Sequence, residues 1–579
     1  MILEALCDYY ETLESKFGWN EVAISAILEL NHDGSLRQVV CCVDEKNKKQ
    51  TMLLPARAKR TSGTKPNFLG DNCKYVLGYD PSQSQAKSAA CFQACAEFHR
   101  QLLTGLNSEK AKTLLKFFSG WRPENAATHP ALQNLSESVY SANCVFRIDG
   151  TYVHEDPEIV SAWNDYFQND GSGPDMVCLI DGSVGPAEPL HPNIKGVFGA
   201  QSSGASLISF NKESFCSYGK EQNFNAPISK KSAFAYTTAL NTLLADKDHF
   251  LRLGDTTLVF WSKNGRSVYQ DLFSLGLGTA NSIDSQNALV SALEKICKGE
   301  NALFNGESID PSMDFYVLGL SPNAARLSVR FFLENSFGYF LKNIHEHYSR
   351  LEISRPSFDK QEFLPLWKLL NETVNQKSKD KFPSPKLVGD MIRAIITNTR
   401  YPTSLLNSVH LRIVADRDEV SSKTGNRIER RMPRTRAAIL KAYYLKNQHP
   451  DVPKEVLTVA LNENSSDVPY NLGRLFAVLE AIQNYASPEV RVSIKDKYFT
   501  SASASPNSIF PTLINLSQRH LHKLEGKGNV VYYEKLLTDI MSKFDGDFPR
   551  HLSLPQRGSF QLGYYHQNQA RFTKKDKED

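Results

Sequence analysis

Residues 59–80 read KRTSGTKPNFLGDNCKYVLGYD and join a basic start to many turn-forming residues. Glycine accepts a positive φ and proline fixes φ, so this composition predicts a loop. Two apolar side chains, Phe68 and Leu69, can hold the loop against a core beneath it. Its candidate polar contacts are Lys59, Arg60, Lys65, Thr61, Ser62, Asn67 and Asn72. Such a loop can place cations near a phosphate backbone and amides near base edges, or it can be a solvated surface loop.

The sequence on either side of this loop indicates a mixed α/β region. Apolar residues at helical spacing predict helices over residues 1–17, 82–106 and 157–167, the last beginning at a proline. Runs of β-branched residues predict strands over residues 22–30, 36–44, 145–148, 177–180 and 257–261. The first two strands are separated by a turn at residues 31–34, which predicts a hairpin. We therefore expect an α/β N-terminal half whose strands pair mainly antiparallel.

Residues 196–206, GVFGAQSSGAS, are rich in glycine and serine and precede a predicted strand at residues 207–210. The spacing differs from the G-x-S-x-G turn of a serine nucleophile, and no lysine follows Gly204 as a P-loop requires. The backbone amides of this segment can hold a phosphate, or the turn can pack closely against the strand. For phosphate contact the candidates are Lys195, Gln201, Ser202 and Ser203, with Lys212, Lys220, Lys230 and Lys231 nearby.

After residue 323 the sequence becomes mostly helical. Helices are predicted over residues 324–351, 363–374 and 385–397. The densest basic run of the chain lies within residues 414–443 and consists of Lys423, Arg427, Arg430, Arg431, Arg434 and Arg436, with Glu429 among them. Each cation that neutralises a phosphate adds salt-dependent affinity for nucleic acid. The run is therefore a candidate backbone contact, and the alternative is a solvated connector.

Residues 452–579 predict a separate helical bundle. Three apolar stripes are expected to form its core, at residues 472–482, 509–524 and 531–544. Several basic side chains fall largely off those stripes and can form a basic face, among them Arg474, Lys495, Lys497, Arg519 and Lys523. We expect three domains, with boundaries at residues 1–322, 323–451 and 452–579. The fold class is mixed, α+β, with an α/β N-terminal half and an all-α C-terminal half.

Size and composition limit the classes of protein to consider. The chain has 579 residues, a formal net charge of +4 and 10 cysteines. This length predicts several domains, and the small net charge means that any basic surface must come from local clustering. No two cysteines form a C-x-x-C pair, so we expect neither a metal site, nor a disulfide framework, nor any cofactor. The acidic N-terminus and the lack of a long apolar run predict no signal peptide and no membrane span, hence a cytoplasmic protein.

Several stretches, in order along nearly the whole chain, resemble one family. They are MILEALCDYY at residues 1–10, KRTSGTKPNFLGDNCKYVLG at 59–78, HPNIKGVFGAQSSGASLISFN at 191–211, SYGKEQNFNAPIS at 217–229, LSPNAARLSVRFF at 320–332, NLGRLFAVLEAIQ at 471–483 and HLSLPQRGSFQLGYYHQNQ at 551–569. With these motifs the chain resembles the large subunit of the type I-C CRISPR surveillance complex, Cascade (the Csd family).

The resemblance implies a non-catalytic subunit that reads the protospacer-adjacent motif (PAM) on duplex DNA, supports R-loop formation and guides the displaced strand. Pairing with the guide supplies the remaining specificity, as in another RNA-guided effector. By this resemblance, Asn67 and Asn72 would approach base edges, while Lys59, Arg60 and Lys65 would hold phosphates. The basic side chains of the C-terminal bundle would be the candidates for the displaced strand.

The resemblance also implies a set of partners. These are the CRISPR guide RNA, target double-stranded DNA, the backbone and handle-binding subunits of Cascade, a small subunit and a helicase-nuclease. In type I-C systems the small subunit is made by internal translation of the same gene. Here that product would begin at Met432 or at a non-AUG codon such as Val452, Val456 or Leu457.

Two other functions are compatible with the residues taken alone. One is a scaffold that contacts only protein, with its basic run solvated. The other is a metal-dependent nuclease, which would need converging Asp, Glu or His side chains. His32 and Asp33 lie in a predicted turn, and His345 and His347 are two residues apart on a predicted helix, so neither pair predicts a metal site.

Overall fold

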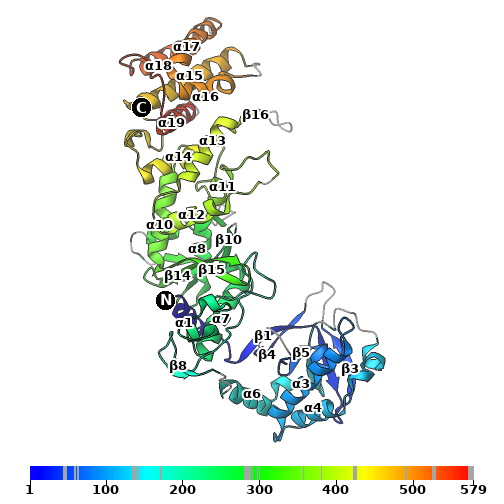
Figure 1. Cartoon of the computed structure of the whole chain (residues 1–579). Coiled ribbons are helices and arrows are strands. Elements are labelled where there is room, and N and C mark those ends of the chain that lie inside the picture. The colour runs from blue at the N-terminus through cyan, green and yellow to red at the C-terminus, as the bar shows by residue number, and fades with distance from the viewer. Residues whose placement is uncertain are drawn as a thin grey trace. The chain divides into compact units, whose positions relative to one another are not determined.

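The computed structural model (Figure 1) describes residues 1–42, 49–57, 60, 64–133, 140, 142–169, 173–253, 255–279, 289, 291–296, 298, 300, 302–356, 358–379, 381–420, 427–488, 492–524 and 530–571. The chain divides into two compact units, which are described separately below. Unit 1 comprises Met1–Phe250, Lys263–Gly265 and Leu318–Phe332. Unit 2 comprises Leu251–Ser262, Arg266–Val317 and Leu333–Asp579.

Unit 1 mixes strands and helices. Its strands are β1 (Trp19–Ile24), β2 (Ala26–Leu30), β3 (Leu36–Cys41), β4 (Gln50–Pro55), β5 (Gly70–Asn72), β6 (Asn143–Ile148), β7 (Thr151–Tyr152), β8 (Asp175–Val177) and β9 (Val184–Pro186). Its α-helices are α1 (Ile2–Tyr10), α2 (Cys73–Val76), α3 (Gln85–Leu103), α4 (Glu109–Gly120), α6 (Pro157–Asn169) and α7 (Lys230–Ala245). Short 3-10 helices lie at Pro123–Thr128, Pro130–Leu132, Val153–Glu155, Glu213–Phe215, Gln222–Asn225 and Lys247–His249.

The sheet of unit 1 has the order β3-β2-β6-β5, with β7 paired to β6. The β2–β3 hairpin is antiparallel, as predicted, and the β2–β6 pair is parallel. Every residue of β2 is buried, which is typical of a strand covered on both faces. The strand predicted at residues 22–30 is in fact two strands, because the chain changes partners at Ser25. The strand before this break, β1, pairs with β4, whereas β2 pairs with β3 and β6.

Three helices of unit 1, α3, α4 and α6, hold the buried end of the loop that contains residues 67–69. Helix α3 packs against both α4 and α6. The ring of Phe68 stacks on Trp163 of α6 at a centroid distance of 5.4 Å. The Leu69 amide donates to Nε2 of His99 on α3 at 2.9 Å. Phe68 and Leu69 are each 1% exposed, which confirms that they fix this loop to the core.

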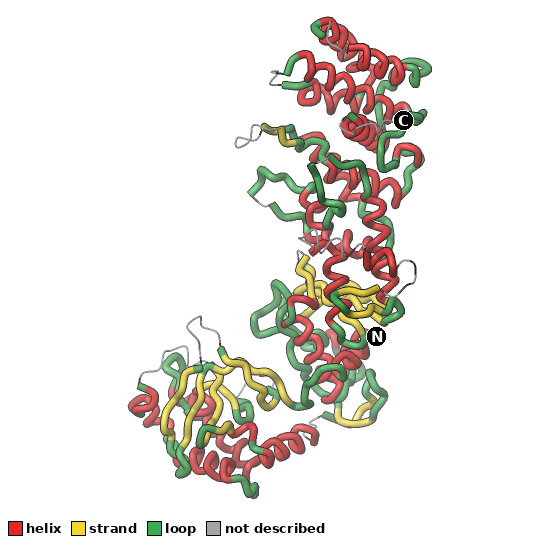
Figure 2. Tube along the Cα trace, turned by 180° about the vertical axis from the view of Figure 1, so that it is seen from behind, coloured by secondary structure: helices red, strands yellow, loops and turns green. Residues whose placement is uncertain are grey.

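Unit 2 contains most of the helices after residue 250 (Figure 2). They are α8 (Ser267–Ser274), α10 (Phe337–Leu351), α11 (Leu366–Asn371), α12 (Pro385–Ile396), α13 (Thr403–Ala415), α14 (Arg434–Asn447), α15 (Val468–Ala486), α16 (Ile494–Ala504), α17 (Pro506–His522), α18 (Val530–Met541) and α19 (Leu554–Ala570), with a π-helical segment at Leu275–Thr279 and a 3-10 helix at Lys454–Val456. Its short hairpins pair β12 (Ala302–Phe304) with β13 (Glu307–Ile309) and β16 (Glu419–Val420) with β17 (Arg427–Ile428).

A further sheet has the order β10-β11-β14-β15. Its strands are β10 (Phe250–Leu253), β11 (Thr256–Ser262), β14 (Asp314–Asn323) and β15 (Arg326–Ser336). The prediction of a helix over residues 324–351 is therefore wrong for its first part. Ala324 has a φ of +52°, so the chain reverses between two strands, and the helix begins only at Phe337. The strand predicted at residues 207–210 is also absent, because only isolated bridges form, between Ile194 and Ala205 and between Ser206 and Arg326.

In the C-terminal bundle, α15 packs against α16, α17, α18 and α19. The stripe at residues 472–482 is buried, as predicted. The stripe at residues 531–544 is only partly buried. Ile540 of this stripe is buried, as predicted, but Val531 is 59% exposed. Helix α18 also buries Tyr533, which the predicted stripe did not include.

The compact units divide the chain at other positions than the three predicted domains do. Residues 251–262 and 266–317 group with the helical part rather than with the N-terminal half. Within unit 2, buried contacts also cross the boundary predicted between residues 451 and 452. The Tyr565 hydroxyl donates to the Ser354 carbonyl at 2.6 Å, and Lys495 forms ion pairs with Asp418 and Glu429. Independent folding of residues 452–579 stays a prediction.

Candidate nucleic-acid interface

The carboxylate of Asp71, in the middle of β5, organises the basic loop within residues 59–80. This side chain is 0% exposed. It accepts hydrogen bonds from the guanidinium of Arg60 and from the backbone amides of Asn67 and Asn72, both amides at 2.9 Å. Arg57 lies 3.7 Å from the same carboxylate. A buried carboxylate that accepts this many hydrogen bonds is compensated for its loss of water and fixes the groups around it.

Arg60 closes the loop on itself. Besides its two contacts with Asp71, its Nε donates to the Lys65 carbonyl at 2.7 Å. Its guanidinium also lies 4.0 Å from the centroid of the Tyr75 ring, a cation–π contact. Its side chain is 26% exposed. Arg60 therefore shapes the loop from inside, while Lys65 is exposed beside it. Lys59, Thr61 and Ser62 lie outside the described residues.

The two asparagines predicted to approach base edges lie in different environments. Asn67 is 4% exposed, so its side chain does not face solvent in this conformation. Beneath it, burial lowers the pKa of His99 to about 4, so this imidazole is neutral at pH 7. A neutral ring can accept the Leu69 amide at Nε2 while its Nδ1 bonds the Cys95 carbonyl at 2.8 Å. At His99 the loop is thus held by a neutral side chain.

Asn72, by contrast, lies at the end of β5 and is half-buried. Its cross-strand partner on β6 is Asn143, so two carboxamides are neighbours in the register. Asn143 accepts a hydrogen bond from Arg57 at 2.5 Å and donates one to the Ala23 carbonyl at 2.9 Å. The side-chain oxygen of Asn72 is buried and has no hydrogen-bond partner among the described residues. Asn72 therefore has an unused acceptor at an ordered edge, but that oxygen does not face solvent in this conformation.

Sequence reasoning missed Asn143 and Arg57 as members of this group. Asn143 comes two residues before the predicted strand at 145–148, and Arg57 comes two residues before the quoted loop. The only available signal was their residue type, because the β5–β6 pairing that joins residues 72 and 143 is not visible in the sequence.

The Gly/Ser segment forms a turn in unit 1 that is exposed at its tip. Ile194 and Ala205 exchange backbone hydrogen bonds at 2.8 Å, which closes the turn. Gly204, with a φ of +91°, has no room for a Cβ, which would lie 2.8 Å from Ile194 O. Lys195, Gln201, Ser202 and Ser203 are all exposed. Close packing therefore explains Gly204, and contact of the exposed tip with phosphate stays a prediction.

The basic run of unit 2 is largely internal. Arg434 is 8% exposed and binds Asp359 at 2.9 Å and the carbonyls of Gln361 and Glu362 at 2.5 and 2.8 Å. Arg436 is 3% exposed and pairs with Glu372 at 2.8 Å and Asp416 at 2.6 Å. Both arginines therefore hold the fold of unit 2 and have no surface to offer a phosphate in this conformation.

The other residues of the basic run differ in their exposure to solvent. Arg431 is 3% exposed and donates to Thr500 at 3.3 Å. Arg430 is exposed, with Nε 3.6 Å from Glu419. Lys423 lies outside the described residues, as does the side chain of Arg427, whose backbone is in β17.

The basic side chains predicted on the C-terminal bundle divide in the same way. Arg474 is 2% exposed and binds Gln567, Asn471 and the Glu463 carbonyl. Lys495 is also 2% exposed and pairs with Asp418 and Glu429. Lys497, Arg519 and Lys523 are exposed. Only these last three could meet a strand at the surface in this conformation.

Two observations on the described residues concern metal binding and membrane insertion. In that part of the chain, no three His, Cys, Asp or Glu side chains are grouped so that they could hold a metal ion. None of the described helices combines the length and the apolar character that crossing a membrane requires.

A family model described as CRISPR-associated protein (Cas_Csd1) matches residues 6–572. The comparison with curated proteins found no match. The matched range includes most of both compact units and all of the motifs quoted above except the first residues.

Proposed function

The chain belongs to the Cas_Csd1 family of CRISPR-associated proteins, a Cascade subunit, and on this premise we propose that it recognises the PAM on target duplex DNA. In this proposal it also supports guide-directed R-loop formation and recruitment of the helicase-nuclease. It acts as a binding subunit rather than an enzyme. Its partners are the guide RNA, the target DNA and the other Cascade subunits.

The observation that carries the proposal is the Asp71-centred edge of β5. Asp71 holds Arg60, Arg57 and the backbone of the loop, and so presets the position of Asn72 beside Asn143. An asparagine carboxamide can bond two edge atoms of an adenine, and each such pair contributes about 1–3 kcal/mol of discrimination. A preset edge loses little conformational entropy on binding, which favours specific contact.

The charges around this edge suit a contact with DNA. Arg57 and Arg60 together outweigh the single negative charge of Asp71, and exposed Lys65 adds another cation. We assign base reading to Asn72, with Asn143 as its neighbour, and phosphate contact to Lys65. Base reading by Asn72 requires its carboxamide to turn, because its side-chain oxygen is buried in this conformation. Asn67 has no part in base reading in this proposal, because the whole residue is only 4% exposed.

The test measures binding of the assembled complex to duplexes with a matched or an altered PAM. We expect Asn72→Ala to reduce the ratio of the two affinities by about 5- to 150-fold, the loss of one bidentate contact. Lys65→Ala should weaken both duplexes equally and lower the slope of log affinity against log salt by about 0.9.

Asn125→Ala is the matched control, because Asn125 is an exposed asparagine of the same unit. It should leave both affinities unchanged. An unchanged affinity ratio in Asn72→Ala would show that this edge does not read bases. If both Asn72→Ala and Lys65→Ala bound every duplex with wild-type affinity and salt dependence, whatever its PAM, the result would instead favour a subunit that contacts only protein.

A further inference from the structure

The connection between α11 and α12 carries a basic and aromatic surface that the sequence analysis did not single out. Residues 375–386 read NQKSKDKFPSPK, with four lysines and one aspartate. Lys377, Lys379, Lys381 and Lys386 are exposed. Between them Phe382 is 78% exposed. We call residues 377–379 and 381–386 the lysine–phenylalanine loop.

Only one of these lysines is engaged by an acid in the described structure. Lys377 pairs with Glu419 of β16 at 3.0 Å, which ties the loop to the β16–β17 hairpin. Among the described residues, no carboxylate forms an ion pair with Lys379, Lys381 or Lys386. These cations lie close together in the sequence, so they create a local positive field on a chain whose net charge is only +4.

Arg436, a residue of the basic run, helps to hold the base of this loop. Glu372, just after α11, accepts hydrogen bonds from Thr435 at 2.5 Å and Arg436 at 2.8 Å. Arg436 bonds Asp416 as well. Val374 is 8% exposed, which anchors the next residues in the core. The buried arginine therefore positions the loop instead of binding the ligand itself.

The other end of the loop is restrained by prolines. Pro383 is buried and follows Phe382 directly, and Pro385 is the first residue of α12. A residue before proline is confined to extended conformations, so the backbone at Phe382 has little freedom. The ring is consequently displayed on an ordered backbone, which reduces the entropy lost on contact.

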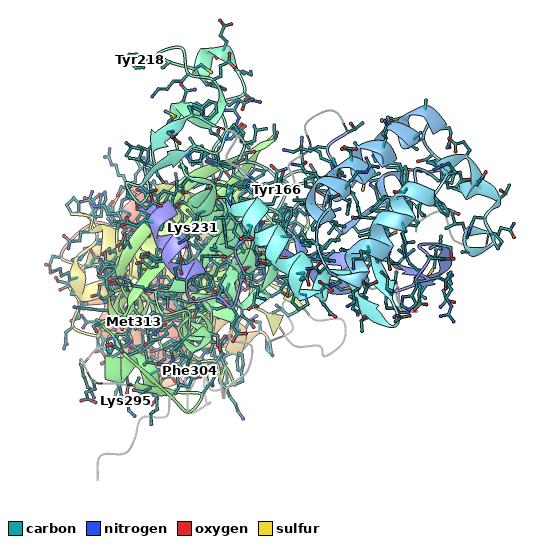
Figure 3. The ribbon with its side chains drawn as sticks, turned by 90° about the horizontal axis from the view of Figure 1, so that it is seen from below. Tyr166, Tyr218, Lys231, Lys295, Phe304 and Met313 are labelled. Carbon is teal, nitrogen blue, oxygen red and sulfur yellow. The ribbon has the colours of Figure 1, made fainter. Side chains whose placement is uncertain are left out.

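An exposed aromatic ring between cations has a specific chemistry. Nucleic-acid bases stack on such rings whatever their sequence, and neighbouring cations neutralise the phosphates. A protein-docking surface does not need the cations. Tyr218 of unit 1 provides the contrast. It is 98% exposed and points away from its unit (Figure 3). Its charged neighbours in the sequence are two lysines, Lys212 and Lys220, and two glutamates, Glu213 and Glu221, whose charges cancel.

We propose that the lysine–phenylalanine loop binds single-stranded nucleic acid. Phe382 stacks on one base, and Lys379, Lys381 and Lys386 neutralise the phosphates on either side. The inference rests on the proposed function, because a Cascade subunit meets single strands. The proposed binding surface does not include Arg474 or Lys495, which are buried.

The first experiment measures binding of the full chain to labelled oligothymidylate at several salt concentrations. Stacking on one base contributes about 1–3 kcal/mol, so Phe382→Ala should weaken binding by about 5- to 150-fold. Phe382→Leu should weaken it equally and Phe382→Trp should not, because only an aromatic ring stacks. Replacing Lys379, Lys381 and Lys386 together by alanine should lower the salt slope by about 2, since each phosphate contact on a single strand contributes about 0.7.

Matched controls come from unit 1. Tyr218→Ala removes an exposed aromatic ring, and a triple alanine variant of Lys16, Lys87 and Lys247 removes three exposed lysines. Neither should change binding by more than about twofold, since each lies outside the proposed site. An oligonucleotide of abasic residues isolates the stacking contribution. It should bind wild type more weakly than oligothymidylate, and Phe382→Ala should remove the difference.

The second experiment identifies the source of the strand. The assembled complex carries a photoreactive uracil analogue either in the guide RNA or in the displaced DNA strand, and crosslinks to Phe382 are mapped by mass spectrometry. A crosslink to either strand supports the proposal and names the source. Wild-type affinity and salt slope in both the Phe382→Ala and the triple-lysine variants would overturn it. Loss of complex assembly with unchanged oligothymidylate binding would overturn it in favour of a protein contact.

These readouts are independent of the PAM. Loss of PAM preference in the Asn72 experiment would leave single-strand binding intact, and loss of single-strand binding would leave the affinity ratio of the two duplexes intact. The two proposals can therefore fail separately.

Discussion

Lys495 carries its ammonium group into the interior of unit 2. Its side chain is 2% exposed, and its Nζ lies 3.0 Å from Asp418 and 2.8 Å from Glu429. Burial of Asp418 opposes its ionisation, but the Lys495 charge and the amides of Arg430 and Arg431 lower the pKa of this carboxyl to about 2. The pair is charged at pH 7, and removing one member leaves the other buried without a counterion.

We expect Lys495→Met to lower the free energy of unfolding by about 3–5 kcal/mol at pH 7, because Asp418 loses its cation. Asp418 has a folded pKa below its unfolded value, so its stabilisation, about 2 kcal/mol, is present above pH 4 and is lost as the pH falls toward 2. The variant lacks this contribution, so its deficit should shrink as the pH falls from about 4 toward 2. Urea unfolding followed by circular dichroism at several pH values measures both effects.

Lys497→Met is the control for this substitution. Lys497 lies on the same helix, α16, but is exposed, so its loss should change stability by less than about 0.5 kcal/mol. Equal effects of the two substitutions would show that the buried ion pairs are not formed.

At the scale of elements, the packing of α15 on α19 depends on two glycines. A Cβ at Gly473 of α15 would lie 1.9 Å from the Phe560 carbonyl oxygen, and a Cβ at Gly563 of α19 would lie 2.1 Å from the Tyr470 carbonyl oxygen. Both obstacles are backbone atoms, which no rotamer change can move. The two helices therefore approach more closely than any other residue at these positions would permit.

Gly473→Ala should consequently destabilise the chain by at least about 2 kcal/mol, despite the better helix propensity of alanine. Thermal unfolding measures the loss. Gly389→Ala in α12 is the control, because its Cβ would meet nothing closer than Thr256 Oγ1 at 4.0 Å. That variant should be neutral or up to about 1 kcal/mol more stable. Comparable melting temperatures for the two variants would contradict the close approach of α15 and α19.

At the scale of the whole molecule, the family match runs from residue 6 to residue 572 and so includes most of both compact units. The PAM proposal belongs to unit 1, and the single-strand proposal belongs to unit 2. Two buried histidines of unit 2 bond tyrosine hydroxyls: His347 bonds Tyr401 at 2.6 Å and His566 bonds Tyr470 at 2.9 Å. Burial lowers the pKa of both to about 3, so neither titrates near pH 7.

The proposal that the chain is a binding subunit and not an enzyme leads to a simple prediction. The assembled complex, incubated with Mg²⁺ or Mn²⁺ and matched target but without the helicase-nuclease, should open the duplex and leave both strands intact. Fluorescence of 2-aminopurine in the target measures opening, and a denaturing gel measures cleavage. Products that disappear with a chelator would instead support the metal-dependent nuclease.

The sequence by itself determined the family, the mixed fold and many of the elements. Periodicity and turn signals are local, so α3, α6, α12 and the β2–β3 hairpin were predicted near their observed positions. The prediction of secondary structure failed where pairing with another strand decides the conformation. Residues 22–30 are one strand by composition and two by pairing, and residues 326–336 have apolar residues suited to a helix but form a strand.

Only the tertiary structure decided which charges are available to a ligand. In the sequence, Arg434, Arg436 and Lys495 resemble Lys379, Lys381 and Lys497. The first three are buried because acids distant along the chain meet them, as Asp359 meets Arg434 and Glu372 meets Arg436. Burying a cation is favourable only where such a partner is within reach, and that distance is a property of the fold. The same is true of Asn72 and Asn143, which become neighbours only through the pairing of β5 with β6.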